Sequence, residues 1–266
     1  MWVSWDSIGG MRSRTDTPTP GPPPPLVFEA ARHRYRLDGR PVTGVTTIID
    51  RGLPKPGIAY WAARVVAETA VDDADGLAGQ VSARGRDSVI RRLKRAPRRA
   101  RDEAAARGTE VHSLAERLVV DDEADVPARL VSHVAGYADF LDARGVEPLL
   151  TEVRVASREH WYAGTADLIA RMGGQTWVLD LKTSNSIHGS YALQCAAYAR
   201  ADFYLDASGA EVPMPRVDRI GAVHVRPEGT RLVEFPDLQA AWEAFLAVKA
   251  VADITDTIDS WGDRKR

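Results

Sequence analysis

The chain has 266 residues, an apolar fraction of 44% and a formal net charge of −2. This length and apolar content allow one large domain or two small ones, and the near-neutral charge gives no global attraction to nucleic acid or membranes. The single cysteine, Cys195, excludes an internal disulfide and any metal or iron–sulfur site built from several cysteines. No apolar run reaches the roughly 18 residues of a transmembrane helix, and the N-terminus lacks the pattern of a secretory signal. We therefore expect a cytoplasmic protein with no membrane association.

A short tail and a largely helical segment are predicted for the N-terminal half. Residues 1–25 lack apolar periodicity and end in a proline-rich run, which favours a disordered, solvated tail. Residues 33–49 are predicted to form two short strands around a turn at Asp38 and Gly39. Helical spacing then predicts helices over 58–70, 86–106 with an interruption at Pro97, 109–119 with Thr109 as its N-cap, and 126–143.

Strands dominate the prediction for the C-terminal half. Three are expected at 149–157, 161–172 and 176–184, and Gly173-Gly174 makes the turn between the last two. A helix over roughly 190–204, strands at 219–227 and 230–235, a helix over 237–254 and a polar tail at 259–266 follow. There is no internal repeat and no second-domain boundary. This order predicts one α/β domain over residues 26–258, with a mixed central sheet flanked by helices.

The strand that begins at Thr176 carries charged residues among apolar ones. Asp180 and Lys182 are two residues apart and therefore share a face, and the preceding hairpin strand can bring Asp167 beside them. Only five of the 35 basic residues are lysines, so a lysine inside an apolar strand calls for a reason. Buried charges are costly unless they are paired or bind a metal. One explanation is a buried ion pair. The one we favour is a site where two carboxylates hold Mg²⁺ or Mn²⁺ and the lysine orients water or stabilises charge on phosphorus.

Four motifs in this order resemble the RecB-like branch of the PD-(D/E)XK nucleases. They are RGTEVHSLAERL at 107–118, GTAD at 164–167, DLKTS at 180–184 and QCAAY at 194–198. The segments YRLDGRPVTGVTTII and YWAA also resemble the N-terminal part of phage-type, CRISPR-associated-like exonucleases. Several relatives hold an iron–sulfur cluster with four cysteines, which Cys195 alone cannot do, so no iron–sulfur cluster is expected.

The resemblance implies a restriction-endonuclease-like core with a helical N-terminal part. It implies that Asp167, Asp180 and Lys182 are catalytic. It further implies that His112, Asp167, Asp180 and the backbone carbonyl of Leu181 hold Mg²⁺ or Mn²⁺. His112 and Glu116 lie four apart on their predicted helix. His112 is therefore either a metal ligand or a histidine paired with Glu116.

Three further features near these motifs have open interpretations. Gln194 and Tyr198 share a helical face, where they either contact the acids and DNA or pack in the core. Glu152 begins a strand beside the site, where it either supports the ligands as a neighbouring acid or has no role, and it is not counted among the site residues. The run at 91–101 has seven basic residues in eleven. It is either a solvated helical face or a set of phosphate contacts that includes Arg91, Arg92, Arg98 and Arg99.

The sequence is therefore expected to encode a metal-dependent DNA exonuclease of phage or bacterial recombination, repair or replication. It would act on single-stranded DNA or duplex ends, in the host cytoplasm if phage-encoded, and a recombination or replication protein is a possible partner. One alternative is a structure-selective or nicking endonuclease that uses the same site. The other is a non-catalytic DNA-binding or assembly module that has kept the fold.

Overall fold

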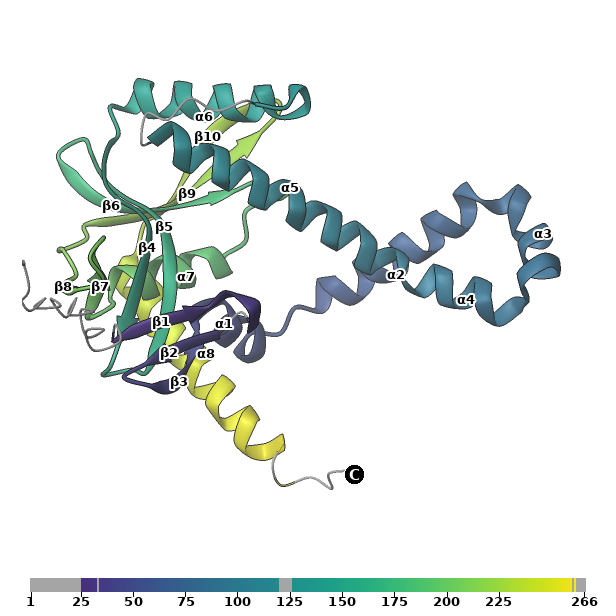
Figure 1. The fold of residues 1–266 in the computed structure, drawn as a ribbon, viewed down its shortest axis with the longest axis horizontal. Helices are drawn as coiled ribbons and strands as arrows, with labels where there is room; N and C mark the ends of the chain where they lie inside the picture. Colours follow the sequence, from purple (N-terminus) through teal and green to yellow (C-terminus); the bar gives the residue numbers. More distant parts are fainter. Residues whose placement is uncertain (1–24, 33, 120–125, 260, 262–266) are drawn as a thin grey trace, which may run out of the picture.

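The computed structural model describes residues 25–32, 34–119, 126–259 and 261. The predicted tails at 1–25 and 259–266 therefore lie almost entirely outside the described residues. The described chain has a mixed α/β fold in which helices flank a mixed sheet, as predicted (Figure 1). None of its helices is both long enough and apolar enough to cross a membrane.

The sheet is built around strand β5 and combines parallel and antiparallel pairing. One path through it has the order β1 (Leu26–Glu29), β2 (Arg34–Leu37), β3 (Arg40–Gly44), β5 (Tyr162–Met172), β4 (Glu147–Ser157), β7 (Phe203–Leu205) and β8 (Glu211–Pro213). A second path leaves β5 through β6 (Gln175–Lys182), β9 (Arg219–Arg226) and β10 (Gly229–Phe235). The β3–β5 and β6–β9 pairs are parallel, and the other described pairs are antiparallel.

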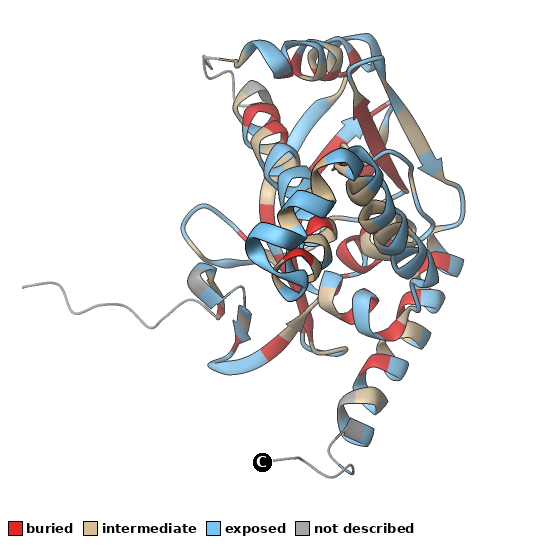
Figure 2. Cartoon of the chain, turned by 90° about the vertical axis from the view of Figure 1, so that its right-hand side faces the viewer, coloured by how far each residue is buried: buried red, intermediate tan, exposed pale blue. Residues whose placement is uncertain are grey.

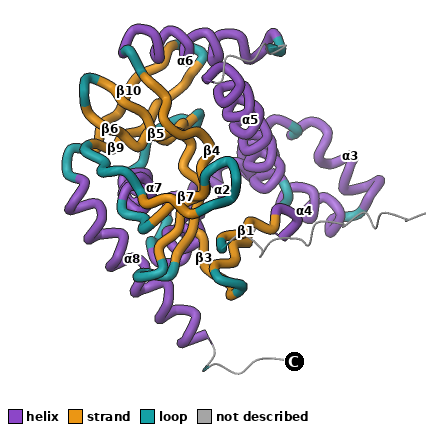
Figure 3. Tube along the Cα trace, turned by 60° about the vertical axis from the view of Figure 1, so that its left-hand side comes forward, coloured by secondary structure: helices purple, strands orange, loops and turns teal. Residues whose placement is uncertain are grey.

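Helices cover both faces of this sheet (Figure 3). On one face, α1 (Val45–Gly52), α7 (Ser190–Ala199) and α8 (Leu238–Asp259) enclose a core that includes Ile48 and Phe245. On the other face, α5 (Ala96–Val119) and α6 (Val131–Arg144) enclose a second core that includes Val111. Burying apolar area on both faces stabilises the sheet. In this arrangement one end of α5 and one end of α7 lie on opposite sides of β5 and β6.

One edge of β5 is shared by two strands, and this creates a fork in the sheet. Strand β4 pairs along almost the whole length of β5. The opposite edge pairs with β3 at Tyr162 and Ala163, and then with β6 from Leu168 to Met172. Residues 164–167 lie between these two pairings, so in the described structure no strand pairs with them on that edge. The GTAD motif therefore lies at the point where the sheet divides, and polar side chains can enter there.

A helical arm projects from this body (Figure 1). It consists of α2 (Pro56–Asp72), α3 (Ala74–Arg84), α4 (Arg86–Lys94) and the first turns of α5. Neither α2 nor α3 contains a buried residue, and Figure 2, in which the arm points toward the viewer, shows mainly exposed surface. The arm therefore has little core of its own. Helix α5 belongs to both parts and connects them.

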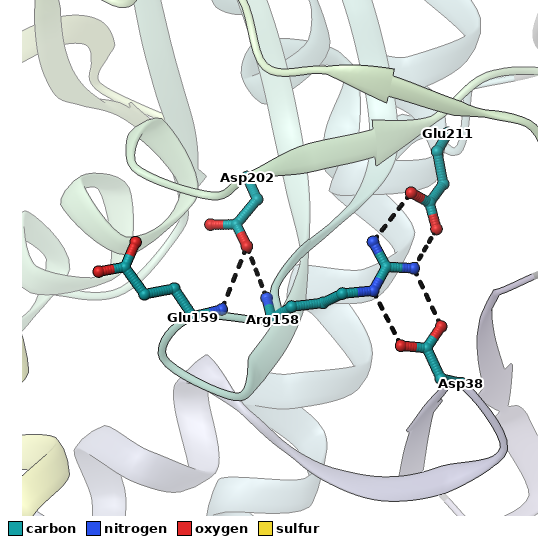
Figure 4. A network of polar contacts seen from close by, with 5 residues as sticks. All are labelled: Asp38, Arg158, Glu159, Asp202 and Glu211. Atoms are coloured by element: carbon teal, nitrogen blue, oxygen red, sulfur yellow. Dashed lines mark hydrogen bonds and ion pairs between the residues drawn. The ribbon is translucent and has the colours of Figure 1, made fainter.

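The N-terminal hairpin is fastened to the far edge of the sheet by one arginine (Figure 4). The Arg158 guanidinium donates to both carboxylate oxygens of Asp38, at 2.8 and 2.9 Å, and also to Glu211 of β8. Asp202 accepts the backbone N–H of Arg158 at 2.7 Å. Hydrogen bonds from Arg158 hold the Asp38 pKa below its ordinary value. This network joins the β1–β3 hairpins to β7 and β8.

Most predicted elements are present, but several boundaries were wrong. The predicted second strand ends at Gly44, and α1 follows because Val45, Ile48 and Ile49 recur at helical spacing and are buried. The break near Pro97 falls at Arg95, since proline is tolerated in the first turn of α5. The predicted helix over 190–204 ends at Ala199, and the chain then pairs with β4 as β7.

The largest correction concerns α5. Thr109 was predicted to cap a new helix, but α5 runs without a break from Ala96 to Val119. The Thr109 hydroxyl instead donates to the carbonyl of Ala105 at 3.1 Å, one turn back in the same helix. The glycine at 108 costs only about 1 kcal/mol inside a helix, which packing of the C-terminal half of α5 can offset. The consequence is a rigid link from the arm to the fork.

Candidate active site

Three side chains converge at the fork from three different elements. His112 comes from α5, Glu152 from β4 and Asp167 from β5, and one potential ligand atom of each lies within 4.8 Å of the others. His112 Nδ1 is 3.5 Å from Asp167 Oδ2. The three residues line a cavity of about 20 Å³, which is enough for one water molecule or a small ion. In the described part of the chain, no other group of His, Cys, Asp and Glu side chains meets this geometry.

The Asp180–Lys182 pair lies beside this cluster but on the α7 side of the sheet. Asp180 is 1% exposed, and its Oδ2 is 2.5 Å from Lys182 Nζ. Its Oδ1 accepts a hydrogen bond from Gln194 Nε2 at 2.9 Å, and the same amide contacts the Tyr198 hydroxyl at 3.1 Å. Asp180 Oδ2 has an ion pair but no hydrogen-bond partner among the described residues. The Lys182 ammonium is therefore the contact that offsets the buried charge of this oxygen.

The backbone of Leu181 links the two groups. Its N–H donates to Asp167 Oδ2 at 2.8 Å, so the Asp167 carboxylate takes the position that a partner strand would otherwise occupy. The described pairing of β5 with β6 accordingly ends at Leu168 and Leu179. The structure thus brings together His112 and Asp167 on one side, and Asp180 and Lys182 on the other. It does not bring Asp180 into the group of three ligand atoms.

The charges at the fork do not balance. Burial, together with the smaller effect of the nearby Asp167 carboxylate, raises the pKa of Glu152 to about 7. Burial also raises the pKa of Asp180, although Lys182 opposes this effect. Burial alone would lower the pKa of Lys182, but the carboxylates of Asp180 and Asp167 raise it above its ordinary value. Lys182 therefore stays protonated, and one cation faces three acids. Such a site favours a further cation.

Local backbone strain marks the same place. Glu152 has a φ of +46°, in the left-handed region that costs a residue with a side chain roughly 1 to 3 kcal/mol. The face alternation of both strands is broken here. Ala166 packs in the core under α7, whereas Leu168, two residues later, packs in the core under α5 and α6. In a regular strand these two residues would share a face. The irregularity turns Glu152 and Asp167 toward the cavity.

Gly164 of the GTAD motif has a steric role. A Cβ atom added there would lie 2.5 Å from Cε1 of Tyr198, far inside van der Waals contact. The glycine therefore lets the Tyr198 ring lie directly against β5, where the ring is 3% exposed and its hydroxyl meets Gln194. Of the two interpretations of Tyr198, core packing describes its ring, while its hydroxyl belongs to the polar network around Asp180.

Glu152 also lines a second, larger cleft, in addition to the small cavity that it shares with His112 and Asp167. This cleft has a volume of about 650 Å³. Its wall is formed by β1–β3 and α1, and its floor includes Thr165 of β5, whose hydroxyl is 3.0 Å from the Tyr35 hydroxyl. The polar side chains that line it include Arg32, Arg34, Arg51, Glu152 and Gln194. Arginines and the Glu152 carboxylate therefore line the same cleft.

The residues of the predicted basic run lie in the arm and are divided between two helices. Arg91 and Arg92 belong to α4, and Arg98 and Arg99 to α5. Arg92 pairs with Asp73 at 2.6 Å, and Arg98 pairs with Asp102 at 3.5 Å. They do not contact the fork.

Glu152 was not predicted to be one of the converging potential ligands. The sequence does carry one signal for it. In the antiparallel register that pairs Val153 with Ala166, position 152 stands opposite Asp167. Two acids at opposed positions of neighbouring strands repel each other unless a cation lies between them.

The chain was also compared with known proteins. No protein-family model matches it, and no curated protein matches it. The interpretation of the site therefore depends on its own residues.

Proposed function

We propose that the chain is a Mg²⁺- or Mn²⁺-dependent DNA exonuclease built on a restriction-endonuclease-like core. One observation carries the proposal. His112, Glu152 and Asp167 converge on an ion-sized cavity at the fork, and the Leu181 N–H connects them to a buried Asp180–Lys182 pair. A purely structural ion pair would explain Asp180 and Lys182, but it would not explain a second, strained group of acids beside them.

The donor set fits a hard divalent cation. Carboxylate oxygens with one imidazole nitrogen suit Mg²⁺ or Mn²⁺, and the excess negative charge at the fork favours such an ion. His112, Asp167 and Glu152 would hold it, with Asp180 and the Leu181 carbonyl as the further ligands that the motif resemblance implies. When bound, the metal would polarise a phosphoryl oxygen and lower the pKa of water.

The chain's own residues would supply positioning and charge. In the hydrolysis, the oxygen of a water molecule bonds to phosphorus and one bridging P–O bond breaks. The water gives up a proton and the leaving oxygen takes one, so the products are a phosphomonoester and a hydroxyl group. The protonated Lys182 would donate to a phosphoryl oxygen as negative charge grows there. Gln194 holds Asp180 in place through its 2.9 Å hydrogen bond. The arginines of the 650 Å³ cleft would hold neighbouring phosphates.

The preference for an exonuclease over an endonuclease follows from the motif around His112, which resembles the exonuclease branch of the RecB-like nucleases. The proposed setting is DNA recombination, repair or replication in the cytoplasm, with a recombination or replication protein as the proposed partner. A structure-selective or nicking endonuclease with the same residues is the second candidate, since the site chemistry is identical.

The test uses variants that keep the buried charge balanced. Removing Lys182 alone would leave Asp180 buried without a partner, which typically costs roughly 3 to 5 kcal/mol. The double variant Asp180→Asn/Lys182→Met removes both charges and should stay folded. The matched control is Lys249→Met/Asp253→Asn, which removes a lysine–aspartate pair of α8 whose charged atoms are 2.6 Å apart.

We expect the fork variant to lose release of labelled nucleotides from end-labelled DNA with Mg²⁺ or Mn²⁺, and the control to keep it. Asp167→Asn should also be inactive. Wild-type turnover by the folded fork variant would refute the assigned roles of Asp180 and Lys182.

A further inference from the structure

The helical arm contains a concave surface lined mainly by arginines. It lies among α3, α4 and the start of α5 and has a volume of about 330 Å³. Gln80, Ser88 and Val89 also line it. We call this surface the arginine hollow, and its five arginines are Arg84, Arg91, Arg92, Arg95 and Arg99. Arg84 lies outside the predicted basic run, and Arg95 lies within it but was not named as a DNA contact. Arg98, which was expected, is not part of it.

Most of these arginines have no partner within the described structure. Arg92 pairs with Asp73, at the junction of α2 and α3, and so has a structural role. The Arg92 Nε atom is buried without a hydrogen-bond partner among the described residues. The side chains of the other four make no ion pair or hydrogen bond in that part of the chain. By contrast, Arg98 and Arg101 outside the hollow both pair with Asp102.

Four unpaired guanidinium groups around one concavity repel each other, and an anion would relieve this repulsion. Guanidinium groups present paired donors that match the oxygens of a phosphate. The overall charge of the chain is close to neutral, so the hollow is a local concentration of positive charge. It is carried on an arm whose helices α2 and α3 bury no residue. Stability alone does not account for such an arm.

We propose that the arginine hollow binds backbone phosphates of the DNA strand whose end is processed at the fork. This inference rests on the proposed function. Helix α5 connects the two places, because Arg99 and His112 are both on it, 13 residues apart. At 1.5 Å per residue their separation along the axis is about 20 Å. Thirteen residues are not a whole number of helical turns, so Arg99 and His112 point to different sides of α5. A DNA strand that contacts both must also pass partly around the helix, and 20 Å is therefore the minimum length of its path.

The separation sets a minimum substrate length. Phosphates of one stacked strand are about 3.4 Å apart, so 20 Å corresponds to roughly six phosphates. A shorter strand that stays stacked cannot occupy the fork and the hollow together. Affinity should therefore rise with length once a strand exceeds about six nucleotides, and this rise should depend on the arginines of the hollow.

The experiment compares two variants of the full chain. Arg84→Gln/Arg95→Gln removes two charges of the hollow without touching the Arg92–Asp73 pair. Arg64→Gln/Arg216→Gln is the matched control, since it also removes two charges and both arginines are exposed, lie outside the hollow and pair with acids. Thermal melting checks that both are folded. Binding of labelled single strands of 4, 8, 12 and 24 nucleotides is followed by fluorescence anisotropy in EDTA over a salt series, and cleavage is measured separately with Mn²⁺.

We expect wild type and the Arg64→Gln/Arg216→Gln control to bind the 24-mer much more tightly than the 4-mer. The double variant should lose most of this gain, and the slope of log affinity against log salt should fall by about 1.4, since each single-strand phosphate contact contributes about 0.7. Equal affinity and slope for the double variant and wild type would overturn the inference. A second result would also overturn it: the double variant loses the binding of tripolyphosphate but keeps its binding of DNA. The hollow would then be a site for free polyphosphate and not for DNA.

The two proposals fail separately. If the double variant cleaves DNA with an unchanged KM, the proposed role of the arginine hollow is wrong and the proposed nuclease activity stands. DNA binding that needs the hollow, in a protein that never cleaves DNA, does the reverse.

Discussion

Replacing Glu152 with glutamine should stabilise the metal-free protein at pH 8. Glu152 is an acid with a pKa near 7 in the folded protein, because it is buried close to Asp167. In the unfolded chain its pKa is about 4.5. The folded state therefore binds the proton more tightly, so the stability of the wild type falls as pH rises from about 4.5 to 7. Glutamine carries no charge and avoids this loss.

The expected size follows from the two pKa values. A difference of about 2.5 corresponds to at most roughly 3.4 kcal/mol, at 1.36 kcal/mol per pKa unit. Glu152 is partly exposed, and solvent screens part of the interaction, so about 1 to 2 kcal/mol is a realistic gain at pH 8. For a chain of this size that raises Tm by about 3 to 6 °C. The gain should shrink as pH falls toward 4.5, where the folded wild type is already protonated.

Thermal unfolding of both proteins in EDTA and in Mn²⁺ measures this effect. Glu103→Gln, an exposed acid of α5, is the control and should change Tm little at any pH. Because Glu152 is assigned as a ligand, Mn²⁺ should stabilise the wild type more than Glu152→Gln. An equal or lower Tm for the glutamine variant in EDTA at pH 8 would refute the argument from unbalanced charge.

Three further predictions concern neighbouring residues. His112→Ala should lower activity at limiting metal and recover in part at high Mn²⁺, and unchanged activity at limiting metal would make His112 structural. Gly164→Ala should cost about 1 to 3 kcal/mol in urea unfolding, because the new methyl group meets Tyr198, and an unaltered midpoint would contradict the contact. Lys182→Met alone should destabilise the fold by roughly 3 to 5 kcal/mol, whereas Asp180→Asn/Lys182→Met should restore most of the loss, and equal stabilities would show that the ion pair contributes nothing.

Local patterns predicted the central part of the fold well. The hairpin at Gly173-Gly174 formed as expected, since both glycines adopt positive φ. The strands around it alternate or run apolar in the way that buried strands do. Motif order also placed His112 and Asp167 together at one point, although they come from distant segments of the chain.

Features that depend on tertiary contacts were not predictable in this way. Glycine is a weak helix former, so the local sequence around Gly108 predicts a break in α5. The helix continues because the packing of its C-terminal half on the sheet outweighs this local preference. The short strand β7 exists only because β4 offers it an edge. The Glu152 side chain points into the site because its backbone has a positive φ and the alternation of the strand is broken there. A prediction from strand periodicity assumes a regular strand and therefore misses both features.

The most direct test of the proposed function is digestion of matched DNA substrates. End-labelled single strands, linear duplex and closed circular duplex would be incubated with the protein in Mg²⁺, in Mn²⁺ and in EDTA. A metal-dependent exonuclease should release nucleotides from the linear substrates only when metal is present, and it should leave closed circles intact. Cleavage of closed circles as fast as linear DNA would contradict an exonuclease, and the absence of cleavage of any substrate with either metal would contradict a nuclease.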